Sequence, residues 1–247
     1  MCNGSIMDKL ISFSLPLMVS GILQLAFNAV DIIVVGRFSG SQALAAVGST
    51  TALINVFTNL FIGISLGANV LAARFYAAGK DREMSETVHT SITLALISGI
   101  MMAVIGVLLA KWALEIMGTP DDVIGQSALY MRIYFMGMPF FMLYNYGAAI
   151  LRAIGDTKRP LIFLIISGIA NAALNMILVI LFHMGVAGVA IGTIISQLIS
   201  CVLVLTCLYR SEGSYQLRFS KLKINGAYME QIFQVGVPAG IQSTVIN

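Results

Sequence analysis

The sequence predicts an all-α, polytopic membrane protein: a bundle of six transmembrane helices followed by a truncated seventh. Hydrophobic residues make up 58% of its 247 residues, charged residues make up only 10%, and the mean hydropathy is +0.92. Soluble domains carry roughly a quarter charged residues, so this composition excludes a water-soluble globular protein. Six apolar stretches each reach the length of about 20 residues that a helix needs to cross a membrane.

The six stretches are continuous apolar runs, whereas the strands of a membrane barrel alternate polar and apolar residues. Because lipid offers no partner for a free backbone N–H or C=O, runs of this length must form helices. Pro16 and Pro139 lie inside two of them and predict a kink or a break. Two pairs of small residues, Gly63 with Gly67 and Gly188 with Gly192, predict close helix packing. We place the spans at Leu10–Val35, Leu53–Tyr76, Val88–Leu114, Val123–Leu151, Pro160–Phe182 and Val186–Tyr209.

The positions of the basic residues predict the orientation of the bundle. Eleven of the 14 Lys and Arg residues lie at the N-terminus or in the second, fourth and sixth connections, and three lie on the other side: Arg37, Lys111 and Arg132. Cytoplasmic connections carry the excess of Lys and Arg, so we expect a multi-pass protein of the cell membrane with a cytoplasmic N-terminus. These residues form short clusters and no continuous basic face, which argues against nucleic acid as a partner.

The C-terminal segment predicts that the chain begins a second copy of its first half. Ile232–Ile241 can be laid over Leu10–Val19, which brings Pro238 opposite Pro16. Many transporters consist of such repeated halves, with the binding site near their interface. We therefore expect an N-terminal six-helix transmembrane lobe at 1–209, a cytoplasmic inter-lobe connection at 210–227, and the start of a truncated second lobe at 228–247. We expect that most of the second lobe of the same chain is missing from this sequence.

No residue pattern indicates an enzyme or a resident cofactor. Cys2, Cys201 and Cys207 lack the spacing of metal ligands and are interpreted as packing residues. Neither His89 nor His183 has a companion at metal-ligand spacing. The chain also lacks a Gly-x-Ser-x-Gly motif, a His-Glu-x-x-His motif and a phosphate-binding loop. Intramembrane proteolysis and ATP-driven transport are thereby disfavoured.

Asp31 is the one acidic residue that falls inside an apolar span, between Val30 and Ile32. An ionised carboxylate at such a position costs about 3 kcal/mol on insertion scales unless it is neutralised or paired. An intramembrane acid is therefore a candidate functional residue. The alternative is that the long first span brings Asp31 near the outer interface, where water and Arg37 would surround it.

Polar residues at helical spacing accompany this acid. On the first span they form one stripe, while Ile22, Phe27, Val30 and Ile33 point elsewhere. Three other spans repeat the pattern. A single stripe is explained equally well by hydrogen bonds between helices, which are worth about 0.6 kcal/mol each, but four stripes with an acid suit a hydrated cavity better. The stripes are Ser20, Gln24, Asn28 and Asp31; Thr51, Asn55 and Asn59; Ser167, Asn171 and Asn175; and Thr193 and Gln197.

This residue set suggests cation exchange. Burial disfavours the charged form of a carboxyl, so Asp31 is a candidate for binding and releasing a proton. Asn171 and Asn175 could instead supply oxygens to a Na⁺ ion held with Asp31. A proton or Na⁺ that competes with a cationic or amphipathic solute for one cavity gives antiport. Pro16, 15 residues before Asp31, is a candidate hinge or a static kink. The Met and aromatic residues between 130 and 146 suit bundle packing better than a substrate wall.

Five segments together make the chain resemble the N-terminal half of the multidrug and toxic compound extrusion (MATE) family. Each segment is loosely defined alone, but their order along nearly the whole chain is fairly specific. The segments are Phe-Asn-Ala-Val-Asp (27–31) leading into Gly-Arg-Phe-Ser-Gly with Ala-Leu-Ala-Ala-Val-Gly (36–48), Gly-x-x-x-Gly-Ala-Asn (63–69), Arg-Phe-Tyr-Ala-Ala-Gly-Lys (74–80), Leu-Arg-Ala-Ile-Gly-Asp-Thr-Lys-Arg-Pro (151–160) and Val-Gly-Val-Pro-Ala-Gly (235–240).

The resemblance implies a two-lobed, twelve-helix exporter of cationic and amphipathic compounds that is driven by H⁺ or Na⁺. It implies that Asp31 carries the coupling cation and that Pro16 is the proline associated with first-helix bending. The polar partners that it implies are Gln24, Asn171, Asn175 and Thr193. One branch of the family has a Glu on the seventh helix where this chain has Ile246, which argues against that branch.

Two other functions remain open at this stage. A flippase for lipid-linked oligosaccharides, from the same superfamily, would need Arg and Lys in its cavity to hold pyrophosphate, and the intramembrane stripes contain no clear base. A non-transporting membrane scaffold would predict that Asp31→Asn has no effect on transport.

Overall fold

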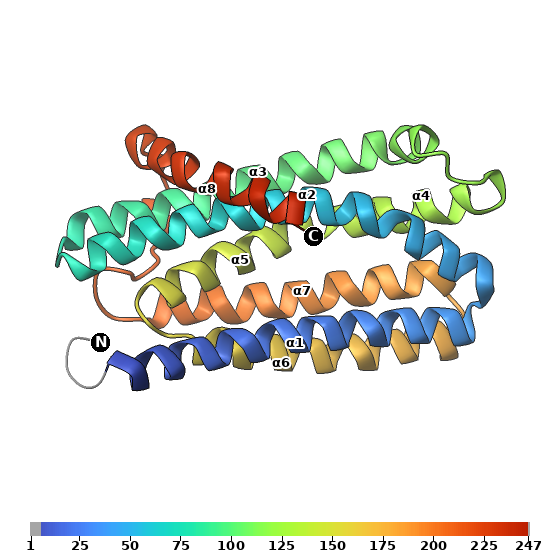
Figure 1. Cartoon of the computed structure of the whole chain (residues 1–247), viewed down its shortest axis with the longest axis horizontal. Coiled ribbons are helices and arrows are strands. Elements are labelled where there is room, and N and C mark those ends of the chain that lie inside the picture. The colour runs from blue at the N-terminus through green and yellow to red at the C-terminus, as the bar shows by residue number, and fades with distance from the viewer. Residues whose placement is uncertain (1–5, 247) are drawn as a thin grey trace.

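The computed structural model describes residues 6–246, apart from the side chains of residues 6, 9, 245 and 246. Cys2 and the side chain of Ile246, to which the sequence analysis assigned meaning, therefore lie outside the described residues. Within the described part, the chain forms helices and no strands, which confirms the all-α fold class (Figure 1). Five helical segments have the length and composition to cross a membrane: α1 (Ile6–Phe38), α2 (Gly40–Ala77), α3 (Asp81–Ile116), α6 (Lys158–Met176) with its π-helical extension η1 (Ile177–Leu181), and α7 (Gly185–Arg210).

The predicted fourth span is divided into two consecutive helices, which is why it is not among these five. Helix α4 (Asp121–Met136) ends before Gly137, and α5 (Met138–Ala153) begins directly after it. Pro139 occupies the second position of α5. A proline there has no N–H to donate and its ring clashes with the carbonyl four residues earlier, which favours a break in the helix at this point. The break predicted at Pro139 is confirmed.

The segment after α7 is fastened to the start of α3. It contains a single 3₁₀ turn, η2 (Phe219–Lys221), and leads into α8 (Gly226–Ile246). The backbone N–H of Arg218 donates to Nε2 of the buried His89 over 3.1 Å. One residue further along α3, Thr90 Oγ1 accepts from the N–H of Asn225 over 3.2 Å. These bonds satisfy backbone groups of an irregular segment, as buried main chain requires.

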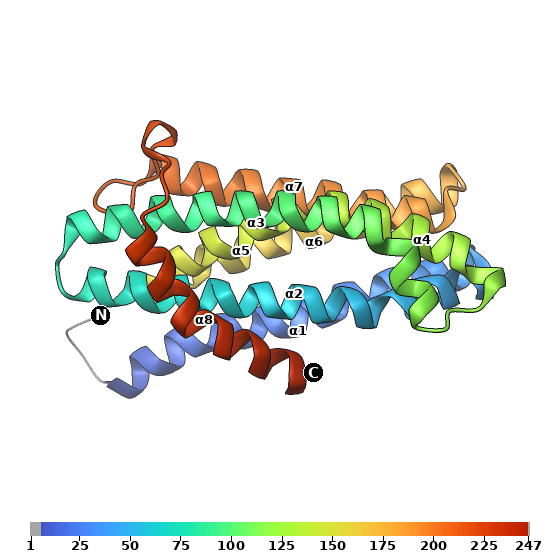
Figure 2. The same ribbon diagram turned by 90° about the horizontal axis from the view of Figure 1, so that it is seen from above.

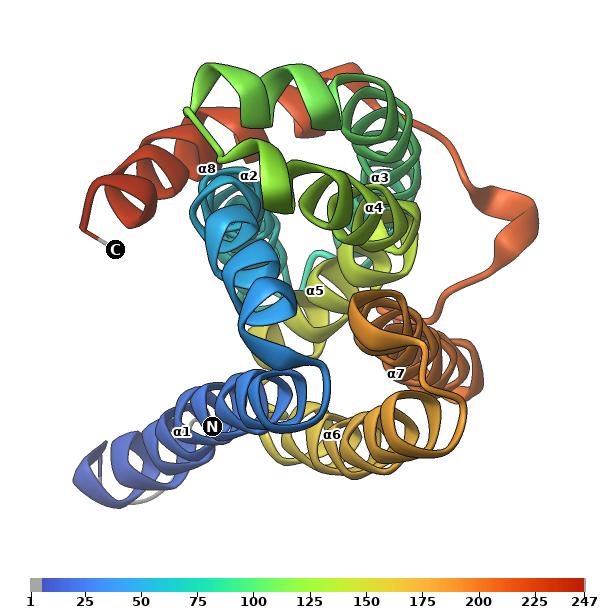
Figure 3. The same cartoon turned by 90° about the vertical axis from the view of Figure 1, so that its right-hand side faces the viewer.

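The long helices run side by side along the longest axis of the molecule, and α8 crosses α2 obliquely (Figure 2). Seen from one end, the helices form a ring with α5 in its interior (Figure 3). Helix α1 packs on α6 and α2, α6 packs on α7, and α3 packs on α4 and α5. The first half of α1 lies at the edge of the bundle, and its side chains there, such as Leu15 and Ile22, are exposed.

Glycines allow the close helix crossings that the sequence predicted. A Cβ on Gly63 would overlap the backbone of Gly240 in α8, and a Cβ on Gly67 would overlap the carbonyl of Ile232. In α7, a Cβ on Gly192 would overlap the side-chain oxygen of Asn175. Gly188 is also closely approached by η1. Both predicted glycine pairs therefore lie at helix contacts.

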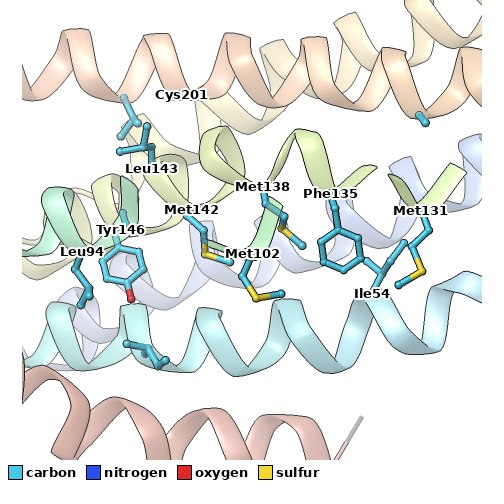
Figure 4. Packing of buried hydrophobic residues seen from close by; sticks show 14 of the residues in the cluster. Ile54, Leu94, Met102, Met131, Phe135, Met138, Met142, Leu143, Tyr146 and Cys201 are labelled. Carbon is cyan, nitrogen blue, oxygen red and sulfur yellow. The ribbon is translucent and has the colours of Figure 1, made fainter. Parts of the chain in front are cut away.

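The apolar core lies between α2, α3 and the divided α4–α5 segment. Met131, Phe135, Met138, Met142 and Tyr146 are all buried there (Figure 4). These side chains from the Met- and aromatic-rich segment thus serve packing, as predicted. Cys201, also expected to be a packing residue, is buried in the same cluster, and Cys207 is partly buried.

Candidate functional site

Polar side chains from six helices line a cavity of about 320 Å³ in the bundle. Helices α1, α2, α6 and α7 contribute residues of the four predicted polar stripes, and α4 and α5 contribute aromatic residues. The lining residues from the stripes are Gln24, Asn28, Asp31, Asn55, Asn59, Ser167, Asn171, Thr193 and Gln197. Periodic polar positions on separate helices therefore converge on one space.

Asp31 faces this cavity and is half-buried. Its Oδ1 accepts a hydrogen bond from Nδ2 of Asn175 over 2.5 Å. Asn175 lies on α6 and is completely buried, so this bond joins the first and fifth predicted spans. Asp31 forms no ion pair with the exposed Arg37 or any other cation of the described residues. The alternative, that water and Arg37 surround Asp31 near the outer interface, is not tested by this absence of an ion pair.

Asn175 connects Asp31 to a longer hydrogen-bond chain. Its Nδ2 also lies 3.3 Å from Oδ1 of Asn171, which is one turn earlier on α6. Asn171 in turn donates from Nδ2 to Thr193 Oγ1 over 3.4 Å, and Thr193 donates to the carbonyl of Val189 over 2.9 Å. Four of the predicted site residues therefore belong to one network that spans α1, α6 and α7.

The side-chain amide oxygen of Asn175, Oδ1, is buried and has no hydrogen-bond partner among the described residues. It lies in the space that Gly192 leaves by having no Cβ. An unpartnered buried amide oxygen is costly, and amide oxygens are ligands for hard cations or for water. Among the described residues, no group of three or more His, Cys, Asp or Glu side chains is arranged so that it could hold a metal ion.

The other two predicted residues on α1 lie nearer the opening of the cavity. Gln24 and Asn28 both line it and are exposed. Phe27 was expected to point away from this stripe, and that expectation was wrong: Phe27 lines the cavity too. Its ring packs where a side chain at Gly168 would be, so the missing side chain on α6 admits the ring.

Pro16 is buried, and α1 continues through it without a break. The carbonyl of Pro16 accepts a hydrogen bond from Ser20 Oγ over 2.7 Å. Because proline has no N–H, the carbonyl of Ser12 lacks its usual partner four residues on. The backbone hydrogen bonding of α1 is therefore weakened at this turn, which lies 15 residues before Asp31.

Four aromatic residues of the cavity were not predicted from the sequence as a wall. Tyr130 and Tyr134 come from α4, and Phe141 and Tyr144 come from α5. Their spacings of four and three residues place each pair on one helix face, and this was the available signal. Tyr144 OH donates to the carbonyl of Pro160 over 3.2 Å, which ties the wall to the start of α6.

Comparison with known proteins gives a consistent family. The MatE family profile matches residues 16–177. Over 244 residues the chain is 33% identical to the "Probable multidrug resistance protein YoeA" of Bacillus subtilis, with 95% of this chain and 52% of that protein covered. It is 28% identical over 256 residues to the "Multidrug export protein MepA" of Staphylococcus haemolyticus, covering 99% and 56% respectively.

The fold also matches solved MATE structures. A MATE crystal structure in the bent conformation superposes with a TM-score of 0.89 at 22% identity, over 96% of this chain and 53% of the other. The chain thus spans about half the length of the relatives it matches. Since the family profile covers well over half of the residues, the chain belongs to the MatE family of multidrug and toxic compound extrusion transporters.

Proposed function

We propose that the chain forms the N-terminal lobe of a secondary active efflux antiporter that exports cationic or amphipathic compounds in exchange for H⁺ or Na⁺. In this proposal residues 1–209 are the six-helix lobe, 210–227 are a cytoplasmic connection, and 228–247 begin a second lobe. The N-terminus is cytoplasmic in the cell membrane. Asp31 is the coupling site, and Gln24, Asn28, Asn171, Asn175 and Thr193 are its polar partners.

The observation that carries the proposal is the position of Asp31 in the polar cavity, hydrogen-bonded to Asn175. A carboxyl in a cavity within the membrane-spanning part of a protein can change its charge state only if a cation reaches it. Polar side chains on four helices and the amide network can hydrogen-bond water, so the cation can stay hydrated in the cavity. A cationic solute in the same cavity would compete for the carboxylate, which is the requirement for exchange.

The hydrogen-bond arrangement favours H⁺ as the coupling ion. The amide nitrogen of Asn175, not its oxygen, points to Asp31 Oδ1, and this leaves Oδ2 available for a proton. A Na⁺ site built from Asp31, Asn171 and Asn175 would need the Asn175 amide to turn so that its buried oxygen faces the ion. Its unpartnered Oδ1 is the group that such a turn would bring into use.

The cavity lining argues against a flippase for lipid-linked oligosaccharides. Among the described lining residues, Asp31 is the charged one, and none is Lys, Arg or His. A pyrophosphate group would need basic partners, and a carboxylate would repel it.

The deciding experiment is gradient-driven transport in proteoliposomes that hold the full-length protein, with a pH gradient and a Na⁺ gradient imposed separately. Asp31→Asn keeps the shape of the side chain but cannot ionise. We expect it to abolish efflux of a cationic dye under either gradient while leaving the amount of inserted protein unchanged. A proton-coupled wild type would respond to the pH gradient alone.

Asp122→Asn is the matched control, because Asp122 is exposed at the start of α4. It should transport like the wild type. Efflux that survives Asp31→Asn undiminished would refute the coupling role, and wild-type protein that never transports would favour a scaffold.

A further inference from the structure

A second cavity, of about 380 Å³, lies at the crossing of α8 over α2 and shares one wall residue, Ile62, with the polar cavity. Most of its wall is apolar and comes from α1, α2 and α8, with Phe13, Leu17, Ile62, Leu66 and Ala239 among the lining residues. Its volume falls within the range of about 300–1,000 Å³ that is typical of small-molecule sites. Leu66 is 49% exposed, so the apolar wall continues to the outer surface of the bundle.

One cation enters this apolar space. Arg152, in the last turn of α5, lines the cavity and is partly buried. Its guanidinium forms no hydrogen bond or ion pair with any described residue.

The helix to which Arg152 belongs offsets only part of this charge. The C-terminal end of α5 carries a partial negative charge of about half a unit, which favours a cation. A guanidinium also presents five donors in a planar fork, and these suit a carboxylate or a phosphate in a bidentate arrangement. A partly buried arginine that has no such partner in an apolar cavity suits an anionic ligand.

The neighbouring polar side chains are uncharged and each makes a hydrogen bond to the backbone, which leaves Arg152 as the charged recognition group. Asn69 donates from Nδ2 to the carbonyl of Ala149 over 2.7 Å, and this bond fixes α2 to α5 at the cavity wall. Ser65 donates to the carbonyl of Ile62 over 2.7 Å. The hydroxyl of Ser65 therefore has no proton left for a ligand, and Asn69 keeps one amide N–H, whereas all five donors of the Arg152 guanidinium are available.

From these observations we propose that the cavity between α1, α2, α5 and α8 binds an amphipathic anion. Its carboxylate or phosphate pairs with Arg152, and its hydrocarbon chain lies along Phe13, Leu17 and Leu66 towards the lipid. The ligand chemistry is a single acidic headgroup on an apolar chain. Two sources share that chemistry: an anionic phospholipid of the bilayer and a free fatty acid. Asp31 does not line this cavity, and the proposal does not depend on the transport reaction.

The test is native mass spectrometry of the full chain in a non-ionic detergent, titrated separately with dioleoyl phosphatidylglycerol, with oleate and with inorganic phosphate. We expect one equivalent of phosphatidylglycerol or oleate to be retained, and no phosphate, because phosphate has no chain for the apolar wall. Retention of phosphatidylglycerol would identify a bilayer lipid as the ligand. Retention of oleate alone would identify a free amphiphile.

Arg152→Gln should weaken that binding at least tenfold, and Arg152→Lys, which keeps the charge, should restore much of it. Lys158→Gln is the matched control, because Lys158 is an exposed cation at the same end of the bundle. It should bind like the wild type. As a second variant, Leu17→Trp fills the apolar wall while leaving Arg152 in place, and it should also lose the ligand.

Equal binding by Arg152→Gln and the wild type would overturn the proposal. So would an equal loss in Lys158→Gln, since that would mean general attraction to surface charge. If Arg152→Gln does not fold, the proposal still fails when Leu17→Trp binds both amphiphiles as tightly as the wild type.

Discussion

At the scale of single residues, Asn175 is the position on which the site network depends. Its amide nitrogen serves both Asp31 and Asn171, from α1 and α6. A hydrogen bond to a charged group contributes about 1.5–3 kcal/mol. If this amide were removed, the carboxyl of Asp31 would lose the hydrogen bond that it accepts from α6.

We therefore predict that Asn175→Leu lowers gradient-driven efflux by the full-length protein about tenfold or more, because the carboxyl loses the donor that orients it. The measurement is the initial rate of dye efflux per amount of protein. Asn145→Leu is the control, since Asn145 donates to the carbonyl of Phe141 on its own helix. Equal rates for Asn175→Leu and the wild type would mean that the network does not orient Asp31.

The polar stripes that contain Asp31, Asn171 and Asn175 could be predicted from the sequence, but the aromatic wall could not. A carboxyl between Val30 and Ile32 is conspicuous in an apolar run, and the four-residue step from Asn171 to Asn175 marks a helix face without any tertiary information. Tyr130 and Tyr134 are different, because an aromatic residue suits a core and a cavity wall equally well. Which of the two it joins depends on the rotation of α4, and tertiary packing sets that rotation.

At the scale of helices, small residues determine which elements cross closely. The helices α2 and α8 meet through glycine on both sides, with Gly63 and Gly67 facing Gly240 and Gly236. Small-residue pairs of this kind let backbones approach in membranes, where apolar surface alone does not drive association. The sequence predicted the pair on α2, but its partner helix followed only from the fold.

Accordingly, Gly63→Leu should separate α8 from α2, because even a Cβ at this position overlaps the backbone of Gly240. Overpacking of this kind costs about 1–3 kcal/mol. Thermal unfolding of the purified chain in detergent should show a clearly lower midpoint. Gly21→Leu is the control, since a Cβ on Gly21 meets no atom within 4 Å; if both variants unfolded at the same temperature, the crossing would not be limited by Gly63.

At the same scale, the prediction of six continuous spans needed one change. Hydropathy does not distinguish a continuous helix from two consecutive helices, so Val123–Leu151 reads as a single apolar run. The proline at position 139 predicted a break, and the structure locates it at Gly137. The π-helical stretch after Asn175, Ile177–Leu181, had no signal in the sequence, because it depends on how α6 fits against α7.

For the whole molecule, the relevant feature is an open polar face. Gln24, Asn28 and Asn55 line the cavity and are exposed in the described chain. On α1, which carries Gln24 and Asn28, the apolar side chains of Ile22 and Ile33 are 65% and 62% exposed, respectively, on other faces of the helix. One face of α1 therefore suits water and the other suits lipid, which is the arrangement that a shared, hydrated chamber between two lobes requires.

This division predicts a difference in chemical reactivity within one helix. In full-length protein whose native cysteines are replaced by alanine, Asn28→Cys should react with a membrane-impermeant maleimide at least tenfold faster than Ile33→Cys. The reason is that the reactive species is the thiolate, which forms in water and is suppressed in an apolar surrounding. The measurement is the rate of mass increase in intact membrane vesicles, and denatured protein, in which both thiols are in water, normalises the two rates. Equal protection of both positions would show that no water reaches the Asp31 cavity, and exchange of cations at that carboxyl would then have no route.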